Sequence, residues 1–348
     1  MEMNFRSDNE SPAAPAILAA VQEANQGAAW AYAEDRWSEQ LDDAFSDLFG
    51  TRTTVLPVST GTAANSIALA AVTPPWGSVY CHRNAHILND ECGAPEFYGG
   101  GLRLVPVDGP DGKFTADSLK RAVRSAEGHG VHSYQATAVS LTQSTESGTV
   151  YLPGEIESLC AMAGQYGLAT HLDGARFGNA VAALGCHPGE VSWRAGIQLL
   201  SFGASKNGCM AAEALLIFDD ATAGDPGLKE RAERLRKRSG HLLSKMRFVS
   251  AQLLAYIKDD LWLNMARHAN AQAAQFARAV ADHEEAELEY SVEANEVFVR
   301  WNVTDLERLS ADGFEFHLWP GHANLARFVF SHSTTDEDTD SLMQAFRN

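Results

Sequence analysis

The sequence of 348 residues has no long apolar run and few clustered basic residues. A membrane-spanning helix needs about 18 or more consecutive apolar residues, so no membrane span is expected. The formal net charge is −18 and the pI is near 5.0. A nucleic-acid-binding surface needs a clustered basic face, and the only dense basic run, residues 231–238, is interspersed with acids. We therefore expect neither a nucleic acid nor a membrane as a partner.

Cysteine is also scarce and unpaired in its spacing. The five cysteines include no C-x-x-C pair: Cys81, Cys92, Cys160, Cys186 and Cys209. An odd number without paired spacing fits reduced thiols better than a disulfide framework or a zinc site. The histidines lack ligand spacing, so no metal is expected. Residues 1–10 are polar, and no signal peptide is expected there. These features favour a cytoplasmic protein.

The chain contains enough apolar sequence for a sizeable core. It is 45% hydrophobic and 21% charged, which suggests two domains or one large domain with an appendage. Short apolar runs alternate with helical patterns through the first two-thirds: residues 53–58, 78–81, 102–107, 136–141, 168–172, 197–202 and 211–218. Such runs, separated by helices, are typical of a parallel sheet that is covered on both faces.

The pattern changes near Lys229. We expect a long helical stretch towards Met265 with one or more breaks, and a second helix over about residues 270–280. The end of the chain predicts a small sheet and a final helix, with strands at residues 296–301, 315–318 and 325–330. The fold class is therefore α/β, with a large domain over residues 1–250 and a smaller α+β domain over residues 251–348.

A first candidate site lies at residues 59–65, Ser-Thr-Gly-Thr-Ala-Ala-Asn, between an apolar strand and a helix. Gly61 lets the backbone approach a ligand closely, and the first amides of the helix favour a phosphate. Thr62 could add a hydroxyl donor. The alternative is an ordinary helix cap with a tight turn. The motif is not a Walker A loop, because no Gly-Lys-Ser/Thr follows.

A second candidate site comes directly after the apolar run 168–172. Ligands of open α/β sheets bind at the carboxyl ends of strands, which places Asp173 and Arg176 well for binding. The alternative is structural: Asp173 caps the next helix, and Arg176 pairs with it.

A third candidate site is Lys206, flanked by small residues after the apolar run 197–202. Burial of a lysine favours its neutral amine, which can form a Schiff base. The alternative is a loop lysine on the surface, where most lysines lie.

The three pieces together are more specific than any one of them. A phosphate cradle, a carboxylate and, 33 residues later (206 − 173), a lysine follow three strands in order. Pyridoxal phosphate (PLP) chemistry needs a phosphate site, a carboxylate for the pyridine nitrogen and an amine for the aldehyde. The sequence therefore predicts a PLP site.

The chain resembles the threonine aldolase and β-eliminating lyase family of fold-type I PLP enzymes, and its low-specificity L-threonine aldolases in particular. The resemblance covers nearly the whole chain and is weakest in the C-terminal third. It depends on the segments 5–9, 32–35, 59–65, 171–176 and 205–208, on His86, and on residues 236–237 and 244–248. Asn9 and Ala33 depart from the family pattern, which carries threonine and glycine there.

The resemblance implies a role for each matching residue. Lys206 would hold the cofactor, Asp173 would face the pyridine nitrogen and His86 would stack on the ring. The other implied roles are a phosphate cradle (Gly61, Thr62), basic residues that reach a phosphate across a subunit interface (Lys237, Arg247), a grip on the substrate carboxylate (Ser7, Arg176, Arg327), a substrate-pocket residue (Tyr32) and a histidine near the substrate hydroxyl (His132). Cofactor contacts for Arg176 and a homotetramer are also implied.

The implied activity is retro-aldol cleavage of L-β-hydroxy-α-amino acids, such as L-threonine, L-allo-threonine and phenylserine, to glycine and an aldehyde. His132, His86 or a water between them is the candidate base for the hydroxyl proton. Two alternatives stay open. The chain could be another PLP-dependent Cα–Cβ or β-eliminating lyase acting on an aromatic β-hydroxy amino acid, or a PLP-binding protein without catalysis.

Overall fold

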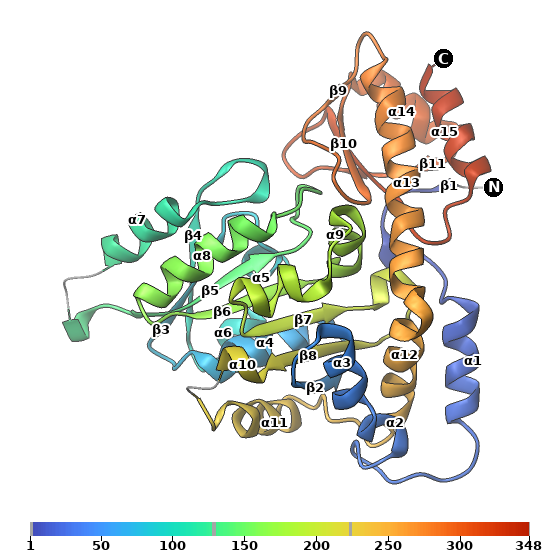
Figure 1. The fold of residues 1–348 in the computed structure, drawn as a ribbon. Helices are drawn as coiled ribbons and strands as arrows, with labels where there is room; N and C mark the ends of the chain where they lie inside the picture. The colour runs from blue at the N-terminus through green and yellow to red at the C-terminus, as the bar shows by residue number, and fades with distance from the viewer. Residues whose placement is uncertain (1–2, 127–129, 223–224, 348) are drawn as a thin grey trace.

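The computed structural model describes residues 3–126, 130–222 and 225–347 (Figure 1). Its strands are β1 Met3–Asn4, β2 Thr53–Val58, β3 Gly77–His82, β4 Arg103–Val107, β5 Gln135–Thr142, β6 Ala169–Gly174, β7 Leu199–Gly203, β8 Glu213–Phe218, β9 Glu287–Leu288, β10 Glu296–Arg300, β11 Phe314–Glu315, β12 His317–Leu318 and β13 Leu325–Val329.

Helices separate most of these strands. The α-helices are α1 Pro15–Ala24, α2 Arg36–Glu39, α3 Leu41–Phe49, α4 Gly61–Val72, α5 His86–Asn89, α6 Ala94–Tyr98, α7 Ala116–Ala126, α8 Pro153–Gln165, α9 Phe177–Leu184, α10 Asp219–Thr222, α11 Leu228–Arg238, α12 Arg247–Ile257, α13 Leu261–Ala281, α14 Val303–Ala311 and α15 Asp336–Arg347. Short 3-10 turns include η1 Asp8–Glu10, η3 Gly130–His132, η6 Ser205–Asn207 and η7 Lys258–Asp260.

The large sheet confirms the strands expected from the apolar runs. Within the described residues it has seven strands in the order β2-β8-β7-β6-β5-β3-β4. The pairs among β3 to β7 are parallel, whereas β8 runs antiparallel to both β2 and β7. The carboxyl ends of β2, β5, β6 and β7 therefore meet at one edge of the sheet, as the argument from the sequence requires.

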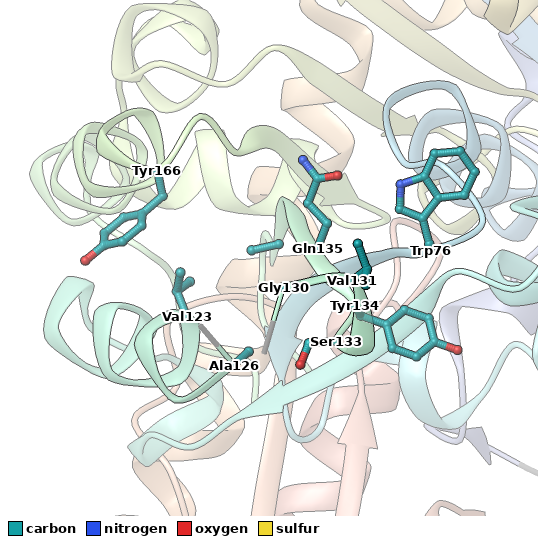
Figure 2. A pocket seen from close by; sticks show the side chains of 10 residues that line it. Trp76, Val123, Ala126, Gly130, Val131, Ser133, Tyr134, Gln135 and Tyr166 are labelled. Atoms are coloured by element: carbon teal, nitrogen blue, oxygen red, sulfur yellow. The ribbon is translucent and has the colours of Figure 1, made fainter. Parts of the chain in front are cut away.

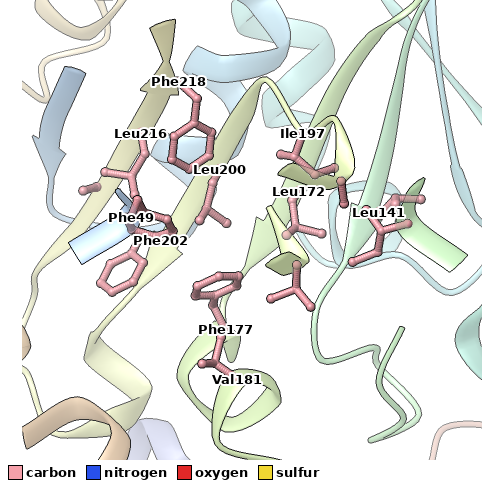
Figure 3. Packing of buried hydrophobic residues seen from close by; sticks show 14 of the residues in the cluster. Phe49, Leu141, Leu172, Phe177, Val181, Ile197, Leu200, Phe202, Leu216 and Phe218 are labelled. Carbon is pink, nitrogen blue, oxygen red and sulfur yellow. The ribbon is translucent and has the colours of Figure 1, made fainter. Parts of the chain in front are cut away.

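Both faces of this sheet are buried. Neighbouring residues of a strand point to opposite faces, and each face packs against its own hydrophobic cluster. On β7, Leu199 packs against α4 and α11, whereas Leu200 joins the larger core on the other face. Figure 3 shows this larger core, in which Phe49, Phe177 and Phe202 fill the space beside the sheet. Their ring centroids lie 6.0–6.3 Å apart, which is a favourable separation for aromatic pairs.

The predicted start of the helix over residues 270–280 is wrong. Helix α13 runs without a break from Leu261 to Ala281, and the break lies earlier, at η7. Asp259 and Asp260 both have positive φ there, 52° and 56°, which interrupts the helical backbone. No glycine or proline lies between Met265 and Asn270, so nothing in that segment ends a helix.

A smaller sheet with the order β12-β13-β10-β9 forms near the end of the chain. The strand expected over residues 315–318 is instead two short strands in different sheets, because β11 pairs with β1 from the N-terminus while β12 pairs with β13. Figure 1 shows both termini beside this small sheet, next to the C-terminal part of α13.

Helix α13 packs in two different hydrophobic cores. Trp262 and Met265 of α13 pack in the core of the large sheet, whereas Ala273 and Phe276 pack in that of the small sheet. Phe5 from the N-terminal segment also belongs to the second core. The domain boundary near residue 250 stays a prediction, and the packing changes from one core to the other further along, within α13. Across the described ranges, no helix has the length and apolar character that would span a membrane.

Candidate active site

A cavity of about 450 Å³ opens at the carboxyl ends of β2, β5, β6 and β7. Its walls bring together most of the residues singled out in the sequence: Gly61, Thr62, His86, Asp173, Arg176 and Lys206. Other polar residues also line it: Asn9, Ser59, Thr60, Asn65, Glu91, Thr142, Ser144, Glu146, Ser205 and Glu213. The three sequence motifs therefore share one site.

The first wall is the N-terminus of α4. Thr60 caps this helix, since its hydroxyl accepts from the Ala63 amide at 3.2 Å. The amides of Gly61 and Thr62 have no acceptor within the helix, so they are left for a ligand. A Cβ on Gly61 would meet no atom within 4 Å, so open space lies in front of the backbone. An anion such as a phosphate fits this position.

The carboxylate of Asp173 comes from the carboxyl end of β6. Its side chain is 3% exposed. Its Oδ1 accepts from the Ala175 amide at 3.0 Å, and its Oδ2 accepts from Asn65 Nδ2 at 2.8 Å. These two bonds fix the plane of the carboxylate.

A chain of hydrogen bonds joins Asp173 to His86. Asn65 Nδ2 donates to Glu91 Oε1 at 2.8 Å as well as to Asp173, and Glu91 Oε1 lies 2.9 Å from His86 Nδ1. The Glu91 side chain is fully buried, whereas the His86 side chain is 41% exposed. The hydrogen bond from Glu91 raises the pKa of His86 above its ordinary value, against the effect of burial.

A cluster of charges adjoins the cavity at Arg176. Its Nε and Nη2 donate to the two oxygens of Asp8 at 2.7 and 2.9 Å, and its Nη1 lies 3.2 Å from Glu296. Glu296 also lies 3.5 Å from Arg327 Nη1. Burial alone would raise the pKa of Asp8, but Arg176, Lys206 and the hydrogen bonds hold it below its ordinary value. A guanidinium has five N–H donors, and two of those of Arg176 are bound to Asp8, so donors remain for a further partner.

Lys206 is held in η6, directly after β7, and is half-buried. Its ammonium forms no hydrogen bond with any residue in the described ranges, which leaves it free to react. The loop below it is fixed by Glu213, whose oxygens accept from the amides of Ala204 and Ser205 at 3.0 and 3.3 Å. Burial raises the pKa of Glu213 to about 7.

His132 lies outside the cavity of its own chain, and its role near the substrate hydroxyl stays a prediction. His132 is exposed in η3, just before the amino end of β5, whereas the cavity lies at the carboxyl end of that strand. The two ends of an eight-residue strand are roughly 20 Å apart. The neighbours Val131 and Ser133 line a different cavity of about 660 Å³, and the described residues of its walls include no lysine or carboxylate (Figure 2).

Five further residues predicted from the sequence lie outside the cavity walls: Ser7, Tyr32, Lys237, Arg247 and Arg327, the last of which pairs with Glu296. The Ser7 hydroxyl accepts from the Asn9 amide at 3.2 Å and lines a neighbouring cavity of about 210 Å³. Tyr32 is exposed, with Lys237 Nζ 4.5 Å above its ring. The Arg247 guanidinium lies 4.9 Å from the Phe248 ring. Their roles in binding substrate or phosphate stay predictions.

Several residues of the site were missed in the sequence. Asn65 and Glu213 stand inside otherwise apolar segments, which is a readable signal, since a buried polar group must find a partner. Asp8 lies within the motif at residues 5–9 but was given no role. Glu91 and Glu146 lie in loops, where acidic residues are ordinary, so no local pattern reveals them.

Glu146 is a buried carboxyl group whose effect on the pH dependence of stability can be measured. Its Oε1 accepts from the His86 amide at 2.8 Å and from the Thr142 hydroxyl at 2.9 Å, while its Oε2 is buried without a partner among the described residues. Burial raises the pKa of Glu146 from 4.5 to about 7. As the pH rises from 4.5 through 7, only the unfolded state releases this proton, so stability falls by up to about 3 kcal/mol.

We expect Glu146→Gln to remove this loss. In cofactor-free protein, the variant should gain stability over the native chain by up to about 2 kcal/mol more at pH 8 than at pH 5. Urea denaturation at the two pH values measures the difference. Glu157→Gln, on the exposed face of α8, is the control and should show no such pH dependence. An equal difference at both pH values for Glu146→Gln would contradict the assigned cause.

The residues of the cavity fit PLP. The open space at Gly61 receives a phosphate, the Asp173 carboxylate suits a protonated pyridine nitrogen, and the unpaired Lys206 amine suits the aldehyde. All three lie at the sheet edge where ligands of α/β folds bind. The fold and the site together define the class, that of the fold-type I PLP enzymes.

Within this class the chain belongs to the beta-eliminating lyase family, which matches residues 4–304. The chain is 41% identical over 343 residues to the low specificity L-threonine aldolase of Pseudomonas aeruginosa, covering 99% of this chain and 96% of that protein. It is 40% identical over 343 residues, with the same coverage, to the low specificity L-threonine aldolase of a Pseudomonas species. The solved structure of Leishmania major threonine aldolase aligns with a TM-score of 0.90 at 26% identity, covering 98% of this chain and 97% of that one. The family and the fold class expected from the sequence are confirmed.

Proposed function

We propose that this protein cleaves L-threonine, L-allo-threonine and related L-β-hydroxy-α-amino acids to glycine and an aldehyde. The observation that carries the proposal is the shared cavity of Lys206, Asp173 and His86, with the Arg176 cluster on its wall. The identity of 41% to a low specificity L-threonine aldolase over nearly the whole chain supports the same reaction.

Arg176 and Arg327 hold the substrate carboxylate in this proposal. Asp8 accepts from two donors of Arg176, and Glu296 forms an ion pair with its Nη1 at 3.2 Å, which fixes the guanidinium. Glu296 also pairs with Arg327. The two arginines are thus held on one carboxylate, and a bidentate contact sets both the position and the plane of a bound carboxylate. Orientation of this kind can contribute several kcal/mol to lowering the barrier.

When bound, PLP supplies an electron sink that accepts the electron pair of the breaking Cα–Cβ bond. Asp173 supports this chemistry because its fixed carboxylate keeps a proton on a facing nitrogen. Lys206 provides the amine that carries the cofactor between turnovers. His86 would cover the ring, and the amides of Gly61 and Thr62 would hold the phosphate.

We also propose an assembly of at least two subunits, and a homotetramer by family resemblance. Lys237 lies with Tyr32 at an exposed surface, and the half-buried Arg247 has an Nε that is buried without a partner among the described residues. These cations support a role toward a phosphate in a neighbouring subunit. The cysteine spacing supports a cytoplasmic location.

Product analysis tests the proposed reaction. The PLP-loaded protein is incubated with L-threonine, L-allo-threonine and L-phenylserine, and glycine, aldehyde and ammonia are measured. We expect glycine and the matching aldehyde in equal amounts from at least one of them. Ammonia with a 2-oxo acid would instead favour a β-eliminating lyase. Saturable binding without turnover would favour a PLP-binding protein that lacks catalysis.

A further inference from the structure

The hydrogen bonds around His86 define what this residue can do in the reaction. Glu91 Oε1 receives two donors, Asn65 Nδ2 at 2.8 Å and His86 Nδ1 at 2.9 Å. The amide of His86 is held separately by Glu146 Oε1 at 2.8 Å. His86 is therefore fixed at both its backbone and its ring, by two carboxyl groups from different loops.

The burial of Glu91 makes His86 its counter-ion. The Glu91 side chain has no exposed surface, and its Oε2 has no partner in the described part of the chain. A buried carboxylate needs a cationic partner, since an unpaired buried charge is costly. Among the described residues, His86 is the one cationic side chain recorded in contact with Glu91. In water an imidazole binds a proton about two pH units more tightly than a carboxylate, so the proton belongs on His86.

The other charged groups that face His86 work in both directions. Asp173 on β6 favours the protonated ring, and Lys206 in η6 opposes it. Burial also opposes the charge, but the bond to Glu91 is the largest influence, and the net pKa of His86 is raised. Glu146 contacts the backbone of His86, and its own pKa is near 7. The balance therefore favours the charged form of His86 more than in a free histidine.

We propose that Glu91 is the positioning residue that keeps His86 protonated, so that His86 acts as a hydrogen-bond donor over the cofactor and not as the base for the β-hydroxyl proton. The part of this inference that concerns the base rests on the proposed aldol cleavage. With Nδ1 bound to Glu91, the ring keeps Nε2–H as its donor toward the cavity. The acceptor for the hydroxyl proton is then another group of the cavity wall, such as Glu146, or a bound water.

Histidine NMR tests the protonation of His86 directly. PLP-loaded protein with isotope-labelled histidine rings is titrated from pH 5 to 9, and the His86 signal is assigned by its absence in His86→Gln. In the native chain we expect both ring nitrogens of His86 to be protonated at pH 7. A neutral His86 at pH 7 in the native chain would overturn the proposal without any need for a Glu91 variant.

Variants of Glu91 show whether its charge or its shape sets the titration midpoint of His86. We expect Glu91→Gln to lower the titration midpoint of His86 by about one pH unit or more, since it removes an opposite charge in hydrogen-bond contact. Glu91→Asp should retain much of the shift, and the exposed Glu157→Gln should leave the midpoint unchanged. An unchanged midpoint in Glu91→Gln would overturn the proposal.

The pH profile of cleavage supplies the second readout. If His86 were the base, kcat/KM would rise with pH through the His86 midpoint, and Glu91→Gln would shift that rise to lower pH together with the NMR midpoint. We expect the rise in kcat/KM not to follow the NMR midpoint. A rise that does follow it in both proteins would overturn the assignment. The NMR titration needs no substrate, so an absence of aldol cleavage would refute the proposed function and leave the role of Glu91 testable.

Discussion

Replacing Lys206 with alanine should abolish turnover and the visible absorption of the bound cofactor together. Lys206 provides the amine for the cofactor aldehyde, and loss of a covalent catalytic group costs on the order of 10³-fold or more in kcat. The Lys206 ammonium makes no hydrogen bond within the described ranges, so the variant should fold normally. Absorption spectra and glycine release from L-threonine measure the two losses.

The control for this experiment is another lysine. Lys229 is exposed on α11, away from the cavity walls, and Lys229→Ala should keep both turnover and the visible band. Adding a small primary amine to Lys206→Ala is a further check, because an external amine can replace part of the lost group. Full turnover of Lys206→Ala without any added amine would contradict the assigned role.

Replacing Asp173 with asparagine should lower kcat/KM by about 100-fold or more. The variant is nearly isosteric but neutral, so it no longer keeps a proton on the pyridine nitrogen. Loss of one fixed electrostatic contact in an active site typically costs 10²- to 10³-fold. The visible absorption of the bound cofactor should also change, because the ring nitrogen loses its proton. Steady-state kinetics and absorption spectra report the two effects.

The fold should tolerate this change. Asn65 donates to Asp173, and its Oδ1 is buried without a partner in the described chain. The side-chain oxygen of Asp173→Asn can still accept from Asn65 Nδ2, as Asp173 Oδ2 does, which limits the loss of stability. Asp117→Asn on the exposed face of α7 is the matched control. Wild-type kinetics with an unchanged spectrum in Asp173→Asn would contradict a contact between this carboxylate and the ring nitrogen.

Much of the large domain could be predicted because its strands are buried on both faces. Apolar runs of five to eight residues between helices mark β2 to β8, and Asp173 and Lys206 follow two of these strands directly. The direction of β8 could not be predicted, since an apolar run carries no information on which way a strand points. The continuity of α13 depends on the absence of any breaker after Met265, which the sequence does show.

The partners of the site residues could not be read from the sequence. Asn65 binds Glu91, which is 26 residues away, and Asp173, which is 108 residues away. Asp8 binds Arg176 across 168 residues. Such pairs are set by the packing of α4 and the N-terminal segment on the sheet, and no local pattern records them. His132 lies just before the amino end of β5, away from the cavity of its own chain, and its residue type alone does not reveal this position.

The central claim is that Lys206 carries the cofactor in a cavity where Asp173 faces the ring. Reduction of the PLP-loaded protein with borohydride, followed by peptide mass mapping, tests it most directly, because reduction fixes the cofactor to the lysine that holds it. We expect the added mass on the peptide that contains Lys206 and on no other lysine. A label on a different lysine, or no label at all, would contradict the account.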